Sequence, residues 1–111
     1  RHDATFGPVV VVGAGGIYAE LFGRAVIRLA PLDEAEAEAA IRAHKAFAVI
    51  DGARGKPRAD LAHFARTVAS VSQFYAGVSD LVAELDLNPV IVLPGGQDNS
   101  VVIADASIVL A

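Results

Sequence analysis

Four consecutive valines, Val9 to Val12, end at a glycine-rich stretch, and this junction limits the folds open to the chain. The apolar run from residue 8 to residue 13 is typical of a buried strand. The next strong pattern, RAVIRLA at residues 24 to 30, alternates as a second strand does. A crossover between parallel strands needs about a dozen residues or more, usually as a helix. The interval is too short for a helix of normal length, so the sequence argues against a parallel βαβ unit here.

The glycines at the junction, Gly13, Gly15 and Gly16, do not complete a known nucleotide-binding turn. The dinucleotide fingerprint requires a third glycine at its sixth place, where this chain has Tyr18. The phosphate loop also requires a lysine after its last glycine, and none follows here. Two interpretations stay open. The glycines permit a bend with a positive φ or a close backbone approach, or their N–H groups face an anion.

Two amphipathic helices are expected in the middle of the chain. Asp33 is a suitable N-cap for the first, and Glu36 completes a capping box. Asp60 is a suitable N-cap for the second, and residues 47 to 50 between the helices are expected to form a short strand. The buried stripe of the second helix is predicted from apolar residues at helical spacing: Leu61, Phe64, Ala65, Val68, Val71 and Tyr75.

The end of the chain is predicted to be a hairpin, with residues 84 to 93 returning as residues 100 to 110. Strands outnumber helices and the hairpin links are short. We therefore expect an α+β fold, a mainly antiparallel sheet with two main helices packed on one face. The 111 residues suffice for one compact core, so residues 1 to 111 are interpreted as a single subdomain.

Polar side chains alternate with leucines in the first strand of this hairpin. Glu84, Asp86 and Asn88 would point to the same face. With the turn at residues 94 to 99, Asn88 lies opposite Asp105, and directly opposed Cβ atoms are about 5 Å apart. Such a cluster of oxygen ligands suits Mg²⁺ better than zinc. The other interpretation is a solvated outer face, and a slip of one residue would turn Asp105 away.

Composition excludes several other classes of function. The net charge is −4 and no basic stretch is present, which argues against a nucleic-acid partner. No apolar stretch is long enough to cross a membrane. The chain has no cysteine, so it has no disulfide or thiolate metal site, as is common in cytoplasmic proteins. It begins with Arg1 rather than Met, and we expect an excised piece of a longer protein.

Five segments of the chain form an ordered set of motifs: FGPVVVVGAGGIYAE (6–20), RLAPLDEAEAEAAI (28–41), DGARGKPRADL (51–61), ELDLNPVIVLP (84–94) and VVIADASI (101–108). In the same order, they resemble the ATP-grasp region of NDP-forming acyl-CoA synthetases. This family includes the ADP-forming acetyl-CoA synthetases and is related to succinyl-CoA synthetase. The resemblance covers roughly residues 3 to 110. The resemblance implies the C-terminal subdomain of an ATP-grasp fold, as a fragment of a larger multidomain acyl-CoA synthetase.

The resemblance also implies a site for ATP or ADP with Mg²⁺. It assigns Asn88 and Asp105 as metal ligands, the pair that the hairpin register brings together, and adds Asp86. Three further residues are implied at the nucleotide: Glu20, Arg28 and Arg54. Each has another interpretation: Glu20 as a solvated carboxylate, Arg28 as a member of an inter-strand ion pair, and Arg54 as a residue that shapes its loop. In the family, ATP phosphorylates a histidine that relays the phosphoryl group to a carboxylate, and the acyl phosphate then reacts with coenzyme A.

Several parts of such an enzyme have no counterpart in the sequence. His2, His44 and His63 do not match the phosphorylated histidine motif, so no catalytic residue is assigned and the isolated fragment is expected to be inactive. The expected partners are the remaining ATP-grasp domain and the coenzyme A-binding domain. Three alternatives stay open: a ligand-sensing domain of an acetyltransferase-fused protein without ligase activity, a non-enzymatic interaction module, and a carboxylase-type ATP-grasp enzyme.

Overall fold

The computed structural model describes residues 1–15, 25–45, 47, 59–96 and 98–111. Its elements are, in chain order, β1 (His2–Asp3), β2 (Gly7–Val12), β3 (Val26–Leu29), α2 (Glu34–Arg42), α4 (Leu61–Val78), β4 (Val82–Leu87), β5 (Val90–Val92), β6 (Val101–Ile103) and β7 (Ala106–Leu110). Every described strand pairing is antiparallel, so the expected α+β class is confirmed. No helix in these ranges is long and apolar enough to cross a membrane.

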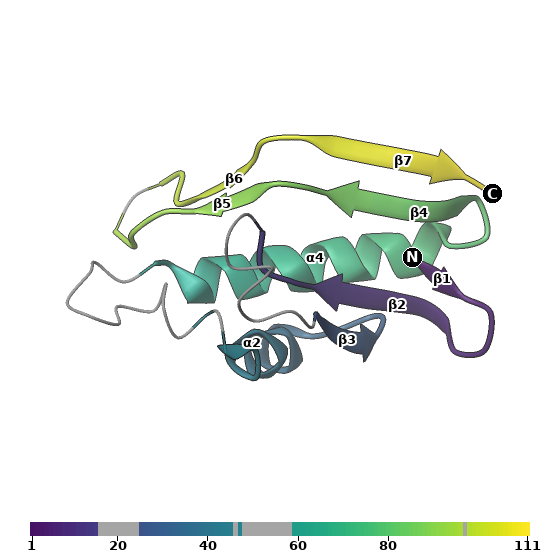
Figure 1. The fold of residues 1–111 in the computed structure, drawn as a ribbon, viewed down its shortest axis with the longest axis horizontal. Helices are drawn as coiled ribbons and strands as arrows, with labels where there is room; N and C mark the ends of the chain where they lie inside the picture. Colours follow the sequence, from purple (N-terminus) through teal and green to yellow (C-terminus); the bar gives the residue numbers. More distant parts are fainter. Residues whose placement is uncertain (16–24, 46, 48–58, 97) are drawn as a thin grey trace.

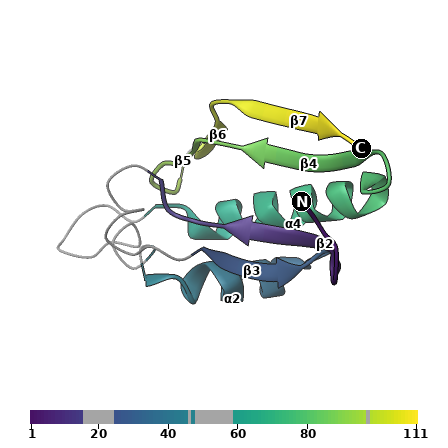
Figure 2. The same ribbon diagram turned by 45° about the vertical axis from the view of Figure 1, so that its right-hand side comes forward.

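In the described part of the chain, the strands form three small sheets and α2 and α4 pack against them. One sheet has the order β1-β2-β3, and β4-β7 and β5-β6 form two-stranded sheets. The helix α4 runs along the long axis of the molecule and contacts β2, β4 and β6, while α2 packs against α4 and β3 (Figures 1 and 2). The arrangement places one long helix under strands from both ends of the chain.

The first helix begins as the sequence predicts. The Asp33 side chain accepts a hydrogen bond from the Glu36 N–H at 2.7 Å, and Glu36 Oε1 accepts one from the Asp33 N–H at 3.1 Å. This reciprocal pair satisfies two N–H groups that the first turn leaves without helical partners. The helix ends at Arg42, so His44 follows it, buried against the edge of the Phe47 ring.

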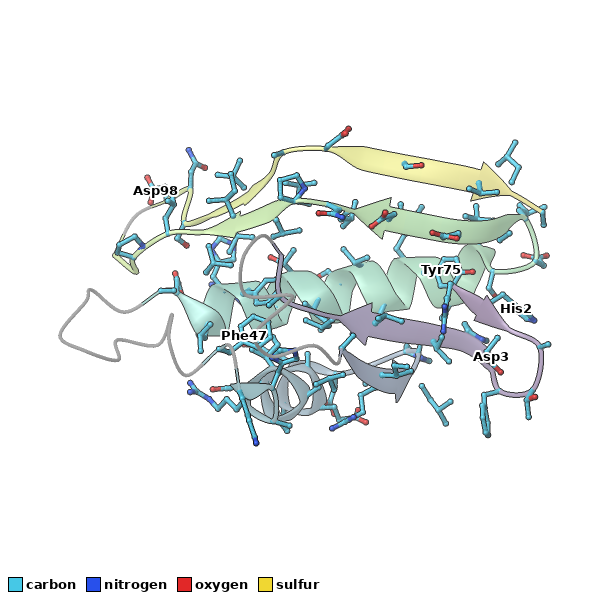
Figure 3. All side chains as sticks on the ribbon, in the orientation of Figure 1. His2, Asp3, Phe47, Tyr75 and Asp98 are labelled. Atoms are coloured by element: carbon cyan, nitrogen blue, oxygen red, sulfur yellow. The ribbon has the colours of Figure 1, made fainter. Side chains whose placement is uncertain are left out.

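The second helix supplies half of the buried core cluster. The predicted stripe is confirmed except at Val71, which is half-buried. The buried residues of α4 are Leu61, Phe64, Ala65, Val68, Ala69, Ser72 and Tyr75. Phe47 lies between α2 and α4 (Figure 3), with its ring centroid 5.8 Å from that of Phe64. Phe47 is helical, which contradicts the start of the strand expected at 47–50; residues 48–50 lie outside the described residues.

Two polar side chains of α4 fasten it to neighbouring segments. The Ser72 hydroxyl accepts a hydrogen bond from the Leu32 N–H at 2.9 Å, 40 residues away in the chain. The Tyr75 hydroxyl lies 3.0 Å from the Val82 carbonyl and 2.8 Å from the Ala83 carbonyl, so it donates to the start of β4. Both hydroxyls have partners despite their burial, as buried polar groups must if they are not to destabilise the fold.

A third contact joins the start of α4 to the C-terminal hairpin. Asp60 caps the helix by accepting from the His63 N–H at 3.0 Å, and its other oxygen accepts from the Ser100 hydroxyl at 2.7 Å. Since the single hydroxyl proton points to Asp60, His63 Nδ1 donates to Ser100 Oγ, 2.8 Å away. The Ser100 hydroxyl and the His63 N–H hold the pKa of Asp60 below its ordinary value.

Replacing Ile41 by alanine tests the packing between α2 and α4. The Ile41 side chain is fully buried in the core cluster, so Ile41→Ala should lower the free energy of unfolding by about 2–5 kcal/mol. Ile27→Ala is the matched control, because Ile27 is 51% exposed on β3 and should cost far less. Urea unfolding of both variants measures the difference, and equal losses would contradict the assigned core.

Acidification tests the Asp60 contact. A carboxylate whose pKa is lower in the folded chain stabilises the fold above its unfolded pKa of about 3.9, and that stabilisation is lost as the pH falls through the folded pKa. Asp60→Asn keeps an N-cap side chain but cannot titrate. The melting temperature of the variant should therefore fall less between pH 6 and pH 3 than that of the original chain. Identical pH profiles would show that Asp60 gains nothing from Ser100.

Candidate functional site

The C-terminal hairpin has the predicted register. Asp86 pairs with Ser107 and Val90 pairs with Ile103. Between these pairs, the Asn88 N–H donates to the Asp105 carbonyl at 3.1 Å. The structure therefore places Asn88 directly opposite Asp105, and this part of the sequence interpretation is confirmed.

The hairpin is nevertheless not two continuous strands. Pro89 lacks an N–H, and the first strand divides there into β4 and β5. The Asn88–Pro89 peptide bond is cis. The returning strand divides at the same level into β6 and β7, so both candidate metal ligands lie at the junction between the two small sheets.

The polar side chains of β4 lie on its exposed side. Glu84, Asp86 and Asn88 are exposed, whereas Leu85 and Leu87 between them are half-buried. This alternation is that of a strand with one face toward α4 and the other toward solvent. No group of three or more His, Cys, Asp or Glu side chains suited to a metal occurs in the described ranges. The predicted site therefore needs the amide oxygen of Asn88 beside the two carboxylates.

Asp105 is positioned by its own backbone. Its Oδ1 accepts a hydrogen bond from the Ala106 N–H at 2.8 Å. Such a local bond restricts the side chain to one orientation at the start of β7. Asp105 and Asn88 are both exposed, so the two side chains are accessible to a ligand on the surface.

The other three predicted residues are not brought to this pair by the described structure. Glu20 and Arg54 lie outside the described residues. Arg28 is on β3 directly opposite Val10, which packs against the core, so Arg28 lies on the helix side of its sheet. Its guanidinium donates to the Ile27 carbonyl at 3.0 Å. A nucleotide contact by any of the three stays a prediction.

The glycine junction is partly described. Neither Gly13 nor Gly15 has a positive φ; the described glycines with one are Gly7 and Gly96. A Cβ on Gly13 would lie 3.4 Å from the Cβ of Ala25, at the lower limit of ordinary van der Waals contact. Gly16 lies outside the described residues, and the anion interpretation stays a prediction.

A cleft of about 620 Å³ lies between the two halves of the molecule. Its walls are residues 9–13 on one side and 84–88 on the other, and buried and half-buried residues of α4 form its floor. Consecutive residues line each wall. Side chains alternate between the two faces of a strand, so a wall of consecutive residues is the edge of a strand rather than its face. Asp86 and Asn88 border this cleft, and Asp105 lies one strand away from it.

Glu84 is a residue of this region that the sequence interpretation left without a role. It continues the exposed row one step before Asp86 and also lines the cleft. Burial, and after it the negative charge of Glu84, raises the pKa of the Tyr75 hydroxyl, which donates to the start of β4. The alternation of polar residues with leucines from residue 84 to residue 88 is the sequence signal that places Glu84 in this row.

The comparison with protein families matches residues 1–110 to the ATP-grasp domain family. The β subunit of ADP-forming acetate–CoA ligase II from Pyrococcus furiosus is 34% identical over 109 residues, which are 98% of this chain and 45% of the relative. The ADP-forming 4-hydroxybutyrate–CoA ligase of Nitrosopumilus maritimus is 34% identical over 97 residues, 87% of this chain and 14% of the relative.

Solved structures agree with these relatives. A Pyrococcus horikoshii protein superposes with a TM-score of 0.88 at 33% identity, over 99% of this chain and 45% of its own. The dinucleotide-forming acetyl-coenzyme A synthetase 1 of Ca. Korarchaeum cryptofilum, solved with coenzyme A and Mg-AMPPCP, superposes with a TM-score of 0.81 at 35% identity, over 99% of this chain and 49% of its own. The chain spans less than half the length of these relatives.

The match extends over almost every residue, and sequence and structure lead to the same relatives. The predicted resemblance is therefore confirmed: this chain belongs to the ATP-grasp domain family and is homologous to the ADP-forming acyl-CoA synthetases.

Proposed function

We propose that this chain is the Mg²⁺–nucleotide-binding part of an ADP-forming acyl-CoA synthetase, with Asn88 and Asp105 as metal ligands. The observation that carries the proposal is the direct opposition of these two exposed residues in the hairpin register. A related enzyme of the same fold was solved with Mg-AMPPCP. Two of the similar proteins are ADP-forming CoA ligases.

The donor set fits Mg²⁺. Magnesium prefers oxygen ligands and is commonly held by one or two carboxylates together with phosphate oxygens and water. Asp105 offers a carboxylate oriented by the Ala106 N–H, and Asn88 offers an amide oxygen. Asp86, two residues before Asn88 on the same exposed row, supplies a second carboxylate within reach of the same ion or of its water ligands.

Phosphoryl transfer depends mainly on positioning and on compensating negative charge. When bound, Mg²⁺ supplies that compensation at the phosphate oxygens. The role proposed for Asn88 and Asp105 is to hold the triphosphate end of the nucleotide at the junction of the two hairpin sheets. Glu20, Arg28 and Arg54 are proposed nucleotide-binding residues, and the two arginines would bind phosphate oxygens through their guanidinium groups.

The complete reaction is proposed for the larger enzyme, which interconverts acid, CoA and ATP with acyl-CoA, ADP and phosphate through a phosphohistidine. This chain contributes no catalytic residue in that proposal. The rest of the ATP-grasp domain and a CoA-binding domain are its proposed partners. Such an assignment accounts for relatives more than twice as long as this chain.

Removing the Asn88 amide tests the assignment. Addition of Mg²⁺ with ADP to the ¹⁵N-labelled chain should shift amide signals near Asp86, Asn88 and Asp105. In Asn88→Ala the apparent affinity should fall at least about tenfold, or about 1.4 kcal/mol, because the ion loses an oxygen ligand.

Asn99→Ala is the matched control, since Asn99 is an exposed asparagine in the turn of the same hairpin. It should leave the titration unchanged. Equal binding by both variants, or shifts centred on another part of the chain, would contradict the proposed site.

A further inference from the structure

The cleft between β2 and β4 has the construction of a slot for one missing strand. Its two walls are strand edges, each lined by consecutive residues. Among the described residues, β4 pairs only with β7, and β2 pairs with β3 on one side and with the two residues of β1 on the other. On the sides that face each other across the cleft, β4 has no strand partner among the described residues and β2 has none beyond Val9.

The unpaired groups of β2 follow from its hydrogen bonds. Val9 exchanges two bonds with Arg1: the Arg1 nitrogen donates to the Val9 carbonyl at 3.0 Å and the Val9 N–H donates to the Arg1 carbonyl at 2.8 Å. Along a strand, the N–H and C=O groups point alternately to one side and the other. Val11 therefore directs its N–H and C=O to the same side as Val9, into the slot, whereas Val10 and Val12 direct theirs to β3.

The same alternation applies to β4. The Asn88 N–H donates toward β7, at the Asp105 carbonyl. Leu87 and Leu85 are one and three residues before Asn88 in the regular part of the pairing. Their N–H and C=O groups therefore point away from β7, into the slot. Val11, Leu85 and Leu87 together direct six backbone hydrogen-bonding groups at one another across the cleft.

The directions of the strands suit one inserted strand. In Figures 1 and 2 the arrows of β2 and β4 point the same way, and the N-terminus lies between them. Because β1 is antiparallel to β2, a strand that continues β1 past Arg1, away from His2, would be antiparallel to both walls. It would lie over α4, whose Phe64, Val68 and Tyr75 line the floor of the cleft.

We propose that this slot accepts one extended β-strand that continues β1 past Arg1. The strand would pair with β2 on one side and with β4 on the other. It would join the separate sheets into one antiparallel sheet in the order β3-β2-inserted strand-β4-β7. Unpaired edges commonly bind an added strand in this way.

The walls also specify the side chains of the inserted strand. Its residues opposite Val10 and Val12 face the core, because Val12 belongs to the core cluster and Val10 packs against it. These positions require apolar side chains. The residue opposite Val11 faces solvent, as Val11 does with 45% of its surface exposed. The slot therefore selects an apolar-polar-apolar segment, in which the polar residue exchanges its backbone bonds with Val11.

The test adds three residues, Val-Thr-Val, directly before Arg1, which places the threonine opposite Val11. Hydrogen exchange is then followed at single amides by NMR. Exchange at Val11, Leu85 and Leu87 should become at least about tenfold slower than in the original chain, because these N–H groups gain partners. Val10 and Val12 are the internal reference, since their N–H groups already point to β3.

The matched control is Val-Pro-Val, because proline is not accommodated in the centre of a sheet. It should leave Val11, Leu85 and Leu87 exchanging as in the original chain. Unchanged exchange with Val-Thr-Val, or equal protection with Val-Pro-Val, would overturn the proposal. The proposal would also be overturned if these three amides were protected in the original chain and lost that protection on dilution, because a second copy of the chain would then occupy the slot.

Discussion

The packing of strands from both ends of the chain against α4 is the constraint on which the rest of the structure depends. Seven residues of this helix are buried, and the helix contacts β2, β4 and β6. Its Ser72 and Tyr75 hydroxyls bind backbone groups before α2 and at the start of β4. Because α4 fixes which face of β4 is covered, Leu85 and Leu87 turn inward and Asp86 turns outward. The exposed row of Glu84, Asp86 and Asn88 at the candidate site follows from that packing.

The features that the sequence predicted correctly are local ones. The Asp33 capping box and the Asp60 cap each need only a side chain and an N–H three residues later. The register that sets Asn88 opposite Asp105 needed only the position of the turn, since a hairpin's pairing follows from its loop. Each of these predictions depended on short separations along the chain.

The features that the sequence did not predict depend on distant contacts. The bond from Ser100 to Asp60 joins residues 40 positions apart, and no pattern around either residue indicates it. Pro89, which lacks an N–H, accounts for the division of the first strand into β4 and β5, but no residue pattern indicates the matching division of the returning strand. The helix-side position of Arg28 became visible only from its pairing with Val10. The slot was hidden for the same reason, because it requires the relative placement of β2 and β4.

The slot and the candidate metal site are neighbours with different chemistry. The slot presents backbone groups and an apolar floor, whereas the metal site presents side-chain oxygens on the exposed face. A strand in the slot would extend the sheet beside Asp86 without covering the face that carries it. The two proposals therefore concern separate surfaces of β4, and each can fail without the other.

The most direct measurement of the central claim replaces Mg²⁺ by Mn²⁺ and records paramagnetic broadening of the ¹⁵N amide spectrum with ADP present. The account predicts broadening strongest at Asn88 and Asp105, weaker along β4 toward Glu84, and absent at Asp98 in the hairpin turn (Figure 3). Loss of the broadening in Asp105→Asn would agree with direct coordination. Broadening centred on the turn, or spread over all exposed acidic residues alike, would contradict a metal site at the junction of the two hairpin sheets.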